Sequence, residues 1–354
     1  MRVSLFLLML SLSAIASEAP RAPITGQVWQ EAVVSVTDLD RSAEFFKVIG
    51  GYEEKWRGNM HATELASWGV ADTATAESML LGPAGQDAGL LRLVRFDNAG
   101  AKQPTRPGSR AWDTGCYFSL VVHMKDMPSI YDDAIRMGWW TETPITRLQR
   151  GESKLNAMIF SGPDGLQVQG YERLESQLPA ELPPFERMTP PLSIMQMVRS
   201  RDAAFEFFTR VLGFETYYNG DPTVSEQPEY TPLGIPINLT TTVRYQTGIV
   251  FPMRGEFGRM EMVEIMDLDG RDHAERCNAP NLGILAVRFP VADTKDALYA
   301  IAERGGRIQL FASGVEIAPY GKLRMFTVKT PDGANVQFYE QLDIAPAVEP
   351  TLSQ

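Results

Sequence analysis

Few side chains in this sequence can act as metal ligands, nucleophiles or redox groups. The chain has three histidines and two cysteines, namely His61, His123, His273, Cys116 and Cys277. A zinc or non-haem iron centre needs three or four donor side chains brought together. The scarcity of histidine and cysteine therefore argues against a His-built metal centre and against a Cys-rich zinc module.

The charged residues exclude further functions. The chain has 33 lysines and arginines but 44 aspartates and glutamates, so its formal net charge is -11. An acidic chain without a basic tract is a poor match for nucleic acid or for an anionic membrane surface. With 44% hydrophobic and 22% charged residues over 354 positions, the composition is typical of a soluble globular protein with a sizeable core.

The first residues are typical of a secretory signal. Arg2 supplies a positive charge, Leu5–Leu12 form a mostly apolar stretch too short to cross a bilayer, and residues 14–16 offer a small-x-small cleavage site. We therefore predict a signal peptide over residues 1–16 and a periplasmic or secreted mature protein without a membrane span. Export would permit a disulfide between Cys116 and Cys277, and two buried free thiols are the alternative.

The second half of the chain repeats the first. The Glu-Phe-Phe run at 44–46 recurs at 206–208, an offset of 162 positions. An aspartate before a predicted helix recurs from Asp126 to Asp293, and a Pro-Asp-Gly turn recurs from 163–165 to 331–333, at offsets of 167 and 168. Three ordered matches at a nearly constant offset indicate an internal duplication.

Each half in turn contains two units. A unit begins with an apolar strand, continues with a helix that ends at glycine, and closes with short strands. The predicted first strands are residues 32–36, 118–124, 194–198 and 285–291. Residues 173–191 carry five prolines and are predicted to be a semi-rigid linker, and residues 343–354 form a tail.

This order of elements resembles the vicinal oxygen chelate superfamily, which includes glyoxalase I, bleomycin-resistance proteins and type I extradiol dioxygenases. The resemblance rests on Asp-Leu after the first strand, Phe-Phe in the helix, Leu-Gly-Phe after it, and Pro-Asp-Gly before the closing strand. It implies an α+β fold of four βαβββ modules, paired into two glyoxalase-like, cup-shaped partial barrels. Pairing the modules in chain order gives an N-terminal domain over residues 28–172 and a C-terminal domain over residues 192–342.

The resemblance also implies where a metal would bind, since metal-binding members use a His on the first strand of each module and a Glu on a closing strand. Neither predicted cup holds three good metal donors at these positions. We therefore predict no cofactor, and no divalent metal in the C-terminal cup. Arg92 is expected to pair with Glu31 in the space of the lost metal, and a solvated surface pair is the alternative. The matching positions are Glu31, Arg92, Ser119 and Gln169 in the first cup, and Ser193, Glu261, Ala286 and Gln337 in the second.

Strand parity suggests what the second cup would bind. Its walls are predicted to be apolar and aromatic, with four converging polar side chains that we predict as ligand contacts: Arg288, Tyr339, Gln337 and Glu261. Such a pocket suits a small, partly apolar anion or phenol, whereas side chains that merely fill the barrel are the alternative. An insertion at residues 219–236 is expected to fold over a cup mouth. His123 is the one histidine on a predicted cavity face and a candidate general base.

Two functions from different classes remain. The missing metal ligands favour a metal-independent binding protein that holds a small organic molecule, as the resemblance to bleomycin-resistance proteins implies. The four-module frame and the polar groups of the second cup favour an enzyme of the superfamily, namely a dioxygenase, lyase or isomerase with an altered site. A structural member with filled cups is a third possibility.

Overall fold

The computed structural model describes residues 21–342 except 109, 151–152, 176 and 181. This part of the chain forms four successive βαβββ modules, as the resemblance implies. Module 1 contains β1 (Glu31–Ser35), α1 (Leu39–Gly50), β2 (Glu53–Asn59), α2 (Ala62–Ser67), β3 (Thr75–Gly82) and β4 (Leu90–Asp97). Module 2 contains β5 (Ser119–His123), α3 (Met127–Arg136), β6 (Thr146–Arg150), β7 (Ser153–Ser161), the short helix η1 (Pro163–Gly165) and β8 (Gln167–Arg173).

The second half follows the same plan. Module 3 contains β9 (Ser193–Met197), α4 (Arg201–Glu206) with its π-helical continuation η2 (Phe207–Val211), β10 (Glu215–Asn219), β11 (Tyr245–Phe251) and β12 (Arg259–Ile265). After the short helix η3 (Ala274–Arg276), module 4 contains β13 (Gly283–Pro290), α5 (Thr294–Glu303), β14 (Ile308–Ile317), β15 (Gly321–Lys329) and β16 (Asn335–Gln341). The predicted first strands are confirmed within two residues, and a helix follows each of them as predicted.

Local sequence explains how the first helix begins and ends. The Asp38 side chain accepts a hydrogen bond from the backbone N–H of Arg41 at 3.0 Å and caps the N-terminus of α1. Gly51, at a φ of 63°, ends α1 in the left-handed conformation that glycine adopts at little cost. One face of α1 lies against the interior and includes Phe45 and Phe46, both fully buried.

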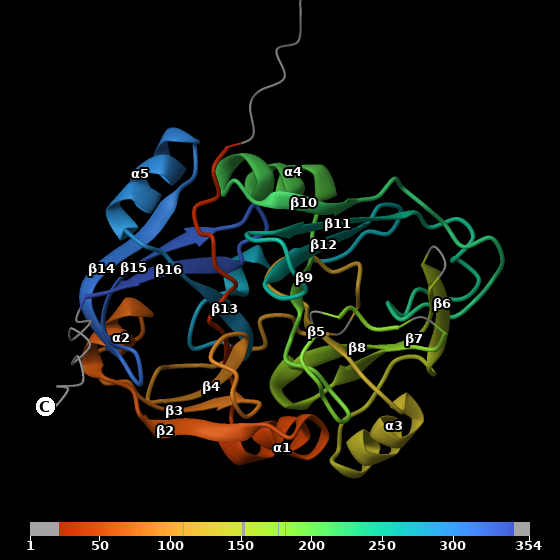
Figure 1. Ribbon diagram of the computed structural model, residues 1–354, viewed down its shortest axis with the longest axis horizontal. Helices are drawn as coiled ribbons and strands as arrows, with labels where there is room; N and C mark the ends of the chain where they lie inside the picture. Colours follow the sequence, from red (N-terminus) through yellow and green to blue (C-terminus); the bar gives the residue numbers. More distant parts are fainter. Residues whose placement is uncertain (1–20, 109, 151–152, 176, 181, 343–354) are drawn as a thin grey trace, which may run out of the picture.

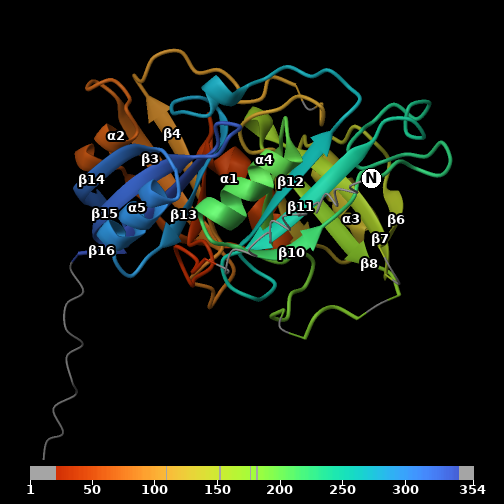
Figure 2. The same ribbon diagram turned by 90° about the horizontal axis from the view of Figure 1, so that it is seen from above.

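The strands form two curled eight-stranded sheets (Figure 1). Sheet 1 has the order β14-β15-β16-β13-β1-β4-β3-β2, and sheet 2 has the order β10-β11-β12-β9-β5-β8-β7-β6. Figure 2 separates the same two groups of strands when the molecule is seen from above. Each sheet encloses one cup, so the predicted α+β class with two partial barrels is confirmed.

The modules do not pair in chain order, so the expectation of one cup within residues 28–172 and another within residues 192–342 is wrong. Sheet 1 joins modules 1 and 4 through antiparallel β1 and β13, and sheet 2 joins modules 2 and 3 through antiparallel β5 and β9. The apolar pattern of a first strand marks its buried face but does not choose its partner, since every strand edge offers the same backbone donors and acceptors.

The two modules within each half of the chain meet through aromatic side chains instead. Phe45 of α1 stacks on Trp139, which follows α3, with ring centroids 4.1 Å apart. Phe214, which follows η2, contacts Phe289 of β13, with centroids 5.6 Å apart. Each half of the chain therefore contributes one module to each sheet, and a shared aromatic core lies between the sheets.

The Pro-Asp-Gly turns also connect the two sheets. Asp164 of module 2 accepts a hydrogen bond from the backbone N–H of Thr37 in module 1 at 2.6 Å. Asp332 of module 4 accepts one from the backbone N–H of Arg199 in module 3 at 2.9 Å. A Cβ at Gly333 would lie 2.2 Å from the carbonyl oxygen of Ala274, so glycine is needed where this turn approaches the neighbouring loop.

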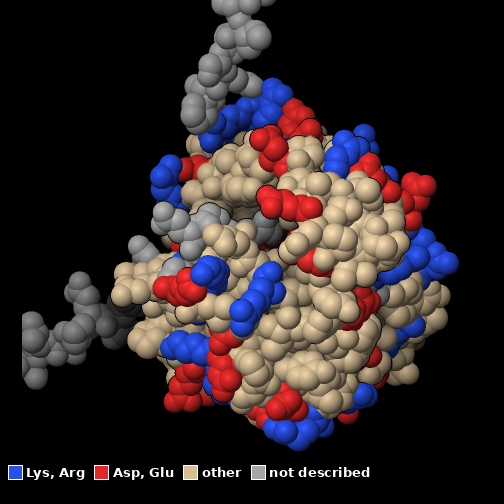
Figure 3. Space-filling view, turned by 90° about the vertical axis from the view of Figure 1, so that its right-hand side faces the viewer, with Lys and Arg blue, Asp and Glu red and all other residues tan. Residues whose placement is uncertain are grey.

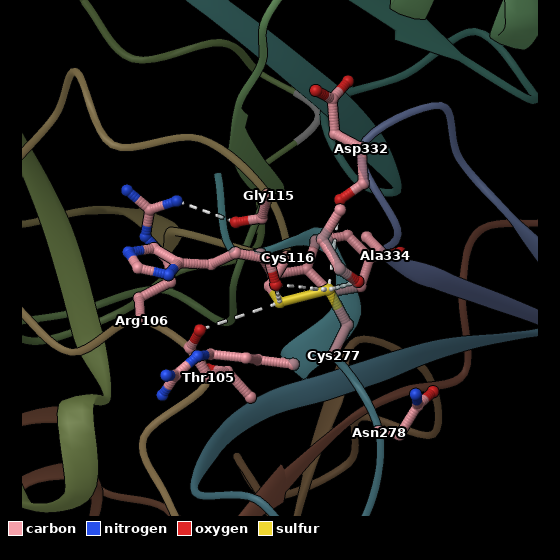
Figure 4. Close-up of a disulfide and its surroundings, with 12 residues drawn as sticks. Thr105, Arg106, Gly115, Cys116, Cys277, Asn278, Asp332 and Ala334 are labelled. Atoms are coloured by element: carbon pink, nitrogen blue, oxygen red, sulfur yellow. Dashed lines mark hydrogen bonds between the residues drawn. A yellow bond between two sulfur atoms is a disulfide. The ribbon is translucent and has the colours of Figure 1, made fainter. Parts of the chain in front are cut away.

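A buried disulfide joins the two loops that connect the modules within each half. Cys116 precedes β5, Cys277 follows η3, and their sulfur atoms are bonded (Figure 4). This decides between the two alternatives that the sequence left open. His273 is buried despite its charged neighbours in the sequence, and its carbonyl oxygen lies 3.4 Å from the Cys116 sulfur.

Two surface properties agree with the composition. No helix within the described residues is long and apolar enough to span a bilayer. On the face that carries the module 3 loops, lysine and arginine side chains alternate with aspartate and glutamate, without an extended patch of one sign (Figure 3).

Candidate functional site

The interior of sheet 1, which we call cup 1, is filled by a network of buried charges. The Arg92 Nε donates to Glu31 Oε1 at 2.8 Å, and an Arg288 terminal nitrogen donates to the same oxygen at 2.7 Å. Arg288 also contacts Glu64 of α2 at 3.1 Å. These four side chains are at most 2% exposed. The predicted pairing of Glu31 with Arg92 is therefore confirmed, and it is a buried pair.

Neutral groups complete the network. Tyr320, in the turn between β14 and β15, donates its hydroxyl to Glu31 at 2.8 Å, and Arg288 donates to the Gln337 side chain at 2.8 Å. Aromatic rings cover the guanidinium groups, since Arg92 lies 5.6 Å from the ring centroid of Trp56 and Arg288 lies 5.4 Å from that of Trp68. Such contacts are attractive because the ring face is electron-rich.

The network shifts the pKa values of its two acids in opposite directions. Burial alone would raise the pKa of Glu31, but the positive charges of Arg92 and Arg288 outweigh it and hold this pKa below its ordinary value. Burial raises the pKa of Glu64, and Arg288 reduces this rise without reversing it. Glu31 is therefore the firm counter-ion of the two arginines.

Cup 1 does not suit a metal ion. Its four metal-site positions hold Glu31, Arg92, Ala286 and Gln337, so a guanidinium group occupies the centre and repels any cation. Both Glu31 oxygens are occupied, because Oε1 accepts hydrogen bonds from Arg92 and Arg288 and Oε2 accepts one from Tyr320. Gln337 accepts from Arg288. The residues present therefore replace a metal rather than bind one.

The interior of sheet 2, which we call cup 2, is open. It contains a cavity of about 650 Å³ whose walls combine apolar and aromatic side chains with polar and charged ones. Side chains that face this cavity include Val121, His123, Leu155, Tyr171, Leu192, Ser193, Tyr217, Ile249, Arg259 and Glu261. A cavity of this size accommodates a small organic molecule.

The floor of cup 2 is polar and only partly satisfied. The Ser193 hydroxyl lies 3.5 Å from Glu261 Oε2, and the Gln169 amide nitrogen donates to the Tyr171 hydroxyl. Within the described residues, the buried Gln169 Oε1, which faces a smaller chamber beside this cavity, has no hydrogen-bond partner. Buried polar atoms normally have partners, so this floor is suited to a polar group from a ligand or to water.

The module 3 insertion covers the inner end of this cup, and not its wide opening as expected. A smaller chamber of about 60 Å³ adjoins the cavity and shares Tyr171, Thr247 and Glu261 with it. Thr231 and Leu233 of the insertion line the chamber. Cup 2 therefore has a deep polar end beneath the insertion and a wide outer end.

Basic and aromatic side chains surround the outer end. The Arg259 guanidinium lies 3.8 Å from the ring centroid of Tyr217 and forms an ion pair with Glu256 at 2.7 Å. Burial, together with the nearby charges of Arg173 and Arg259, lowers the pKa of His123, so its ring is neutral at pH 7. His123 thus lies on a cavity face as predicted.

Cup 2 does not suit a catalytic metal either. Its metal-site positions hold Ser119, Gln169, Ser193 and Glu261, which offer one carboxylate and no imidazole. Among the described residues no group of three or more His, Cys, Asp or Glu side chains could hold a metal ion. Zinc and non-haem iron need more and stronger donors than this set provides.

The four predicted ligand contacts are not brought together. Arg288, Gln337 and Tyr339 belong to sheet 1, whereas Glu261 belongs to sheet 2. Arg288 and Gln337 are engaged in the buried network, and Tyr339 lies further out in a separate cavity. Only Glu261 faces the open cup. The prediction failed because it paired modules 3 and 4 in one cup. The residues that face a cup were identified correctly on each strand.

Sequence reasoning also missed several residues of both cups. Glu64 and Tyr320 reach cup 1 from a helix and a turn, where strand parity gives no guidance. Arg259 could have been found, because it lies two residues before Glu261 on the same face of β12.

Comparison with known proteins supports the fold alone. No family model and no curated protein matches the sequence. The structure resembles glyoxalase I from Zea mays at 13% identity and a TM-score of 0.58, covering 89% of this chain and 92% of that one. It also resembles a proposed dioxygenase from Bacillus subtilis at 12% identity and a TM-score of 0.52, covering 89% of this chain and 86% of that one. The vicinal oxygen chelate fold inferred from the sequence is therefore confirmed.

Proposed function

We propose that this chain is an exported, metal-independent binding protein that holds a small, partly apolar organic molecule in cup 2. The observation that carries the proposal is the contrast between its two cups. Cup 1 is closed by a buried ion network, whereas cup 2 retains a cavity of about 650 Å³ and, in the chamber that adjoins it, an amide oxygen of Gln169 that has no hydrogen-bond partner among the described residues. A cup that served only as packing would be filled like cup 1.

The walls indicate the chemistry of the ligand. Val121, Leu192 and Ile249 offer apolar contact, and Tyr171 and Tyr217 add aromatic surface. Glu261 and Gln169 at the floor accept hydrogen bonds, so the inner end of the ligand should carry a hydroxyl or amine donor. The ligand would therefore be an amphipathic molecule that binds with its polar end inward.

Two features support export. The first sixteen residues have the pattern of a signal peptide, and the disulfide between Cys116 and Cys277 is the kind of bond that persists in oxidising compartments. Mass spectrometry of the protein secreted by its source would test this, with Ser17 as the expected first residue.

Crystallographic screening with a library of small fragments tests the binding proposal even while the ligand is unidentified. Fragments should collect in cup 2, and Ile249→Trp should exclude them because this side chain lines the cavity. Val48→Trp is the matched control, since Val48 is exposed on α1. A screen in which no fragment enters cup 2 would refute the proposal.

Glu261 favours a second candidate function. A carboxylate beside the Ser193 hydroxyl at the floor of an open cup has the position of a general base, so an enzyme of the superfamily with a metal-independent site is the alternative. A molecule that binds in cup 2 should be recovered unchanged if the protein only binds it. Chemical conversion that Glu261→Gln abolishes would instead establish the enzyme.

A further inference from the structure

Sheet 1 has a second cavity, outside the ion network that fills cup 1. Its volume is about 720 Å³, close to that of the cavity in cup 2. Residues from β2, β3, β16 and the turn between β14 and β15 line it, including Lys55, Leu80, Tyr320 and Tyr339. We call it the outer cavity of sheet 1.

The duplication places this cavity at the same position as the outer end of cup 2. Lys55 and Tyr217 are the bulged residues of equivalent strands, since the register shifts between Glu54 and Trp56 in β2 and between Thr216 and Tyr218 in β10. Tyr339 and Tyr171 are likewise equivalent, each lying opposite the end of a first strand. All four line their respective cavities.

The two cavities differ in depth. In cup 2 the cavity continues down to Ser193 and Glu261. In sheet 1 the Tyr320 hydroxyl bonds to Glu31, the equivalent of Ser193, and the Tyr320 ring lies 5.5 Å from the Arg92 guanidinium. Tyr320 therefore forms the floor of a shallow cavity and separates it from the network below.

The lining combines an aromatic wall with hydrogen-bond donors. The rings of Tyr320 and Tyr339 are nearly parallel, at 21° with centroids 6.1 Å apart. Within the described residues, no hydrogen bond or ion pair engages the Lys55 ammonium. Burial raises the pKa of Tyr339, so its hydroxyl stays protonated and can donate.

Two acidic residues also border the cavity but differ in availability. Glu340 is occupied, because its carboxylate accepts from Thr294 at 2.8 Å and from Arg324 at 3.2 Å. Asp87 is exposed at the rim. Lys55 would therefore attract an anionic ligand to this cavity, whereas Asp87 would repel it.

We propose that the outer cavity of sheet 1 is a second, independent small-molecule site for a flat aromatic molecule with one anionic group. The ring would lie against Tyr320 and Tyr339, and the anion would accept from Lys55 and the Tyr339 hydroxyl. The site goes beyond the function proposed for cup 2, because it shares no residue with that cup.

Fluorescence titration with 8-anilinonaphthalene-1-sulfonate tests this proposal, since the probe is aromatic and monoanionic. The titration uses the Ile249→Trp protein, in which cup 2 is obstructed, so the two sites are measured separately. Lys55→Glu should weaken the remaining binding at least fivefold, and Asp87→Asn should strengthen it about twofold, because the two charges have opposite signs. Lys102→Glu, the same charge change outside the cavity, is the control.

The outcomes are distinguishable. Loss of all probe binding in Ile249→Trp, or binding that Lys55→Glu leaves unchanged or strengthens, would refute the second site while leaving cup 2 untouched. Tyr339→Phe provides a second measurement, because it removes only the hydroxyl and should weaken binding twofold or more without altering the unfolding midpoint. Circular dichroism of each variant confirms that the fold is retained.

Discussion

Cup 1 and cup 2 arise from the same duplicated modules, yet they are filled in opposite ways. At equivalent positions cup 1 holds Glu31 and Arg92, bonded at 2.8 Å, whereas cup 2 holds Ser193 and Glu261, which approach only to 3.5 Å. The first cup has become a sealed electrostatic core and the second has remained a cavity. Duplication thus allows one copy of a site to support the fold while the other stays available for a ligand.

The largest effect is expected where the sealed cup loses its shared acid. Glu31→Leu leaves Arg92 and Arg288 buried without their counter-ion, which should lower the free energy of unfolding by about 3–5 kcal/mol. Ser193→Ala, the equivalent change in cup 2, should alter it by less than about 1 kcal/mol. Urea denaturation measures both variants. Similar losses in the two would show that the cups do not differ in this way.

The disulfide should matter to both cups equally, because it joins the loops between modules. Replacing Cys116 and Cys277 together by alanine should lower the free energy of unfolding by about 2–4 kcal/mol, because the unfolded chain gains conformational entropy when the cross-link is removed. Fragment occupancy of cup 2 should persist in crystals of this variant. A loss below about 0.5 kcal/mol in urea denaturation would contradict the prediction.

Acidification should change the contributions of the two acids of cup 1 to stability in opposite directions. The pKa of Glu31 lies below its ordinary value of 4.5, so its contribution to stability is full above that value and is lost as the pH falls through the lowered pKa. The pKa of Glu64 is raised, so its contribution is full below 4.5 and is lost as the pH rises through the raised pKa.

Unfolding measured between pH 7 and pH 3.5 compares the parent protein with Glu31→Gln and with Glu64→Gln. On acidification the parent should lose stability relative to Glu31→Gln and gain it relative to Glu64→Gln. If acidification changed the stability of the parent in the same direction relative to both variants, the pKa values of the two acids would not be shifted in opposite directions.

The smallest effect concerns the aromatic cover of the cups. Trp56 lies over the Arg92 guanidinium, and its equivalent in sheet 2, Tyr218, is an exposed residue at the cavity mouth. Trp56→Leu should lower the free energy of unfolding by about 0.5–2 kcal/mol through the lost cation–π contact. Tyr218→Leu should change it by less than about 0.5 kcal/mol. Thermal unfolding at matched pH compares the two variants. An equal loss of stability in both would show that the aromatic rings of the two cups do not differ in their contribution.

Sequence periodicity identified the strands, the helices and the positions that face each cup, because these depend on local patterns. The family resemblance, rather than periodicity, predicted that Arg92 and Glu31 would meet, and they do so because they lie on neighbouring strands of module 1. Periodicity could not choose the partner of module 1, because β1 and β13 recognise each other through backbone groups that all strands share. For the same reason it grouped Glu261 with Arg288, which lie in different sheets.

The nested pairing of modules has a consequence for how the chain is made. Modules 2 and 3 adjoin in sequence, so their sheet can form as soon as residue 265 has been synthesised. The strand β1 can pair with β13 only later, because Arg288, which bonds to Glu31, lies 257 residues further along the chain. Throughout this interval module 1 exposes the edge of β1 and the apolar surface beside it, a state that invites aggregation. Synthesis that pauses between residues 265 and 283 should therefore be the most damaging to yield, since by then only module 4 is missing and the oldest part of the protein is still unpaired.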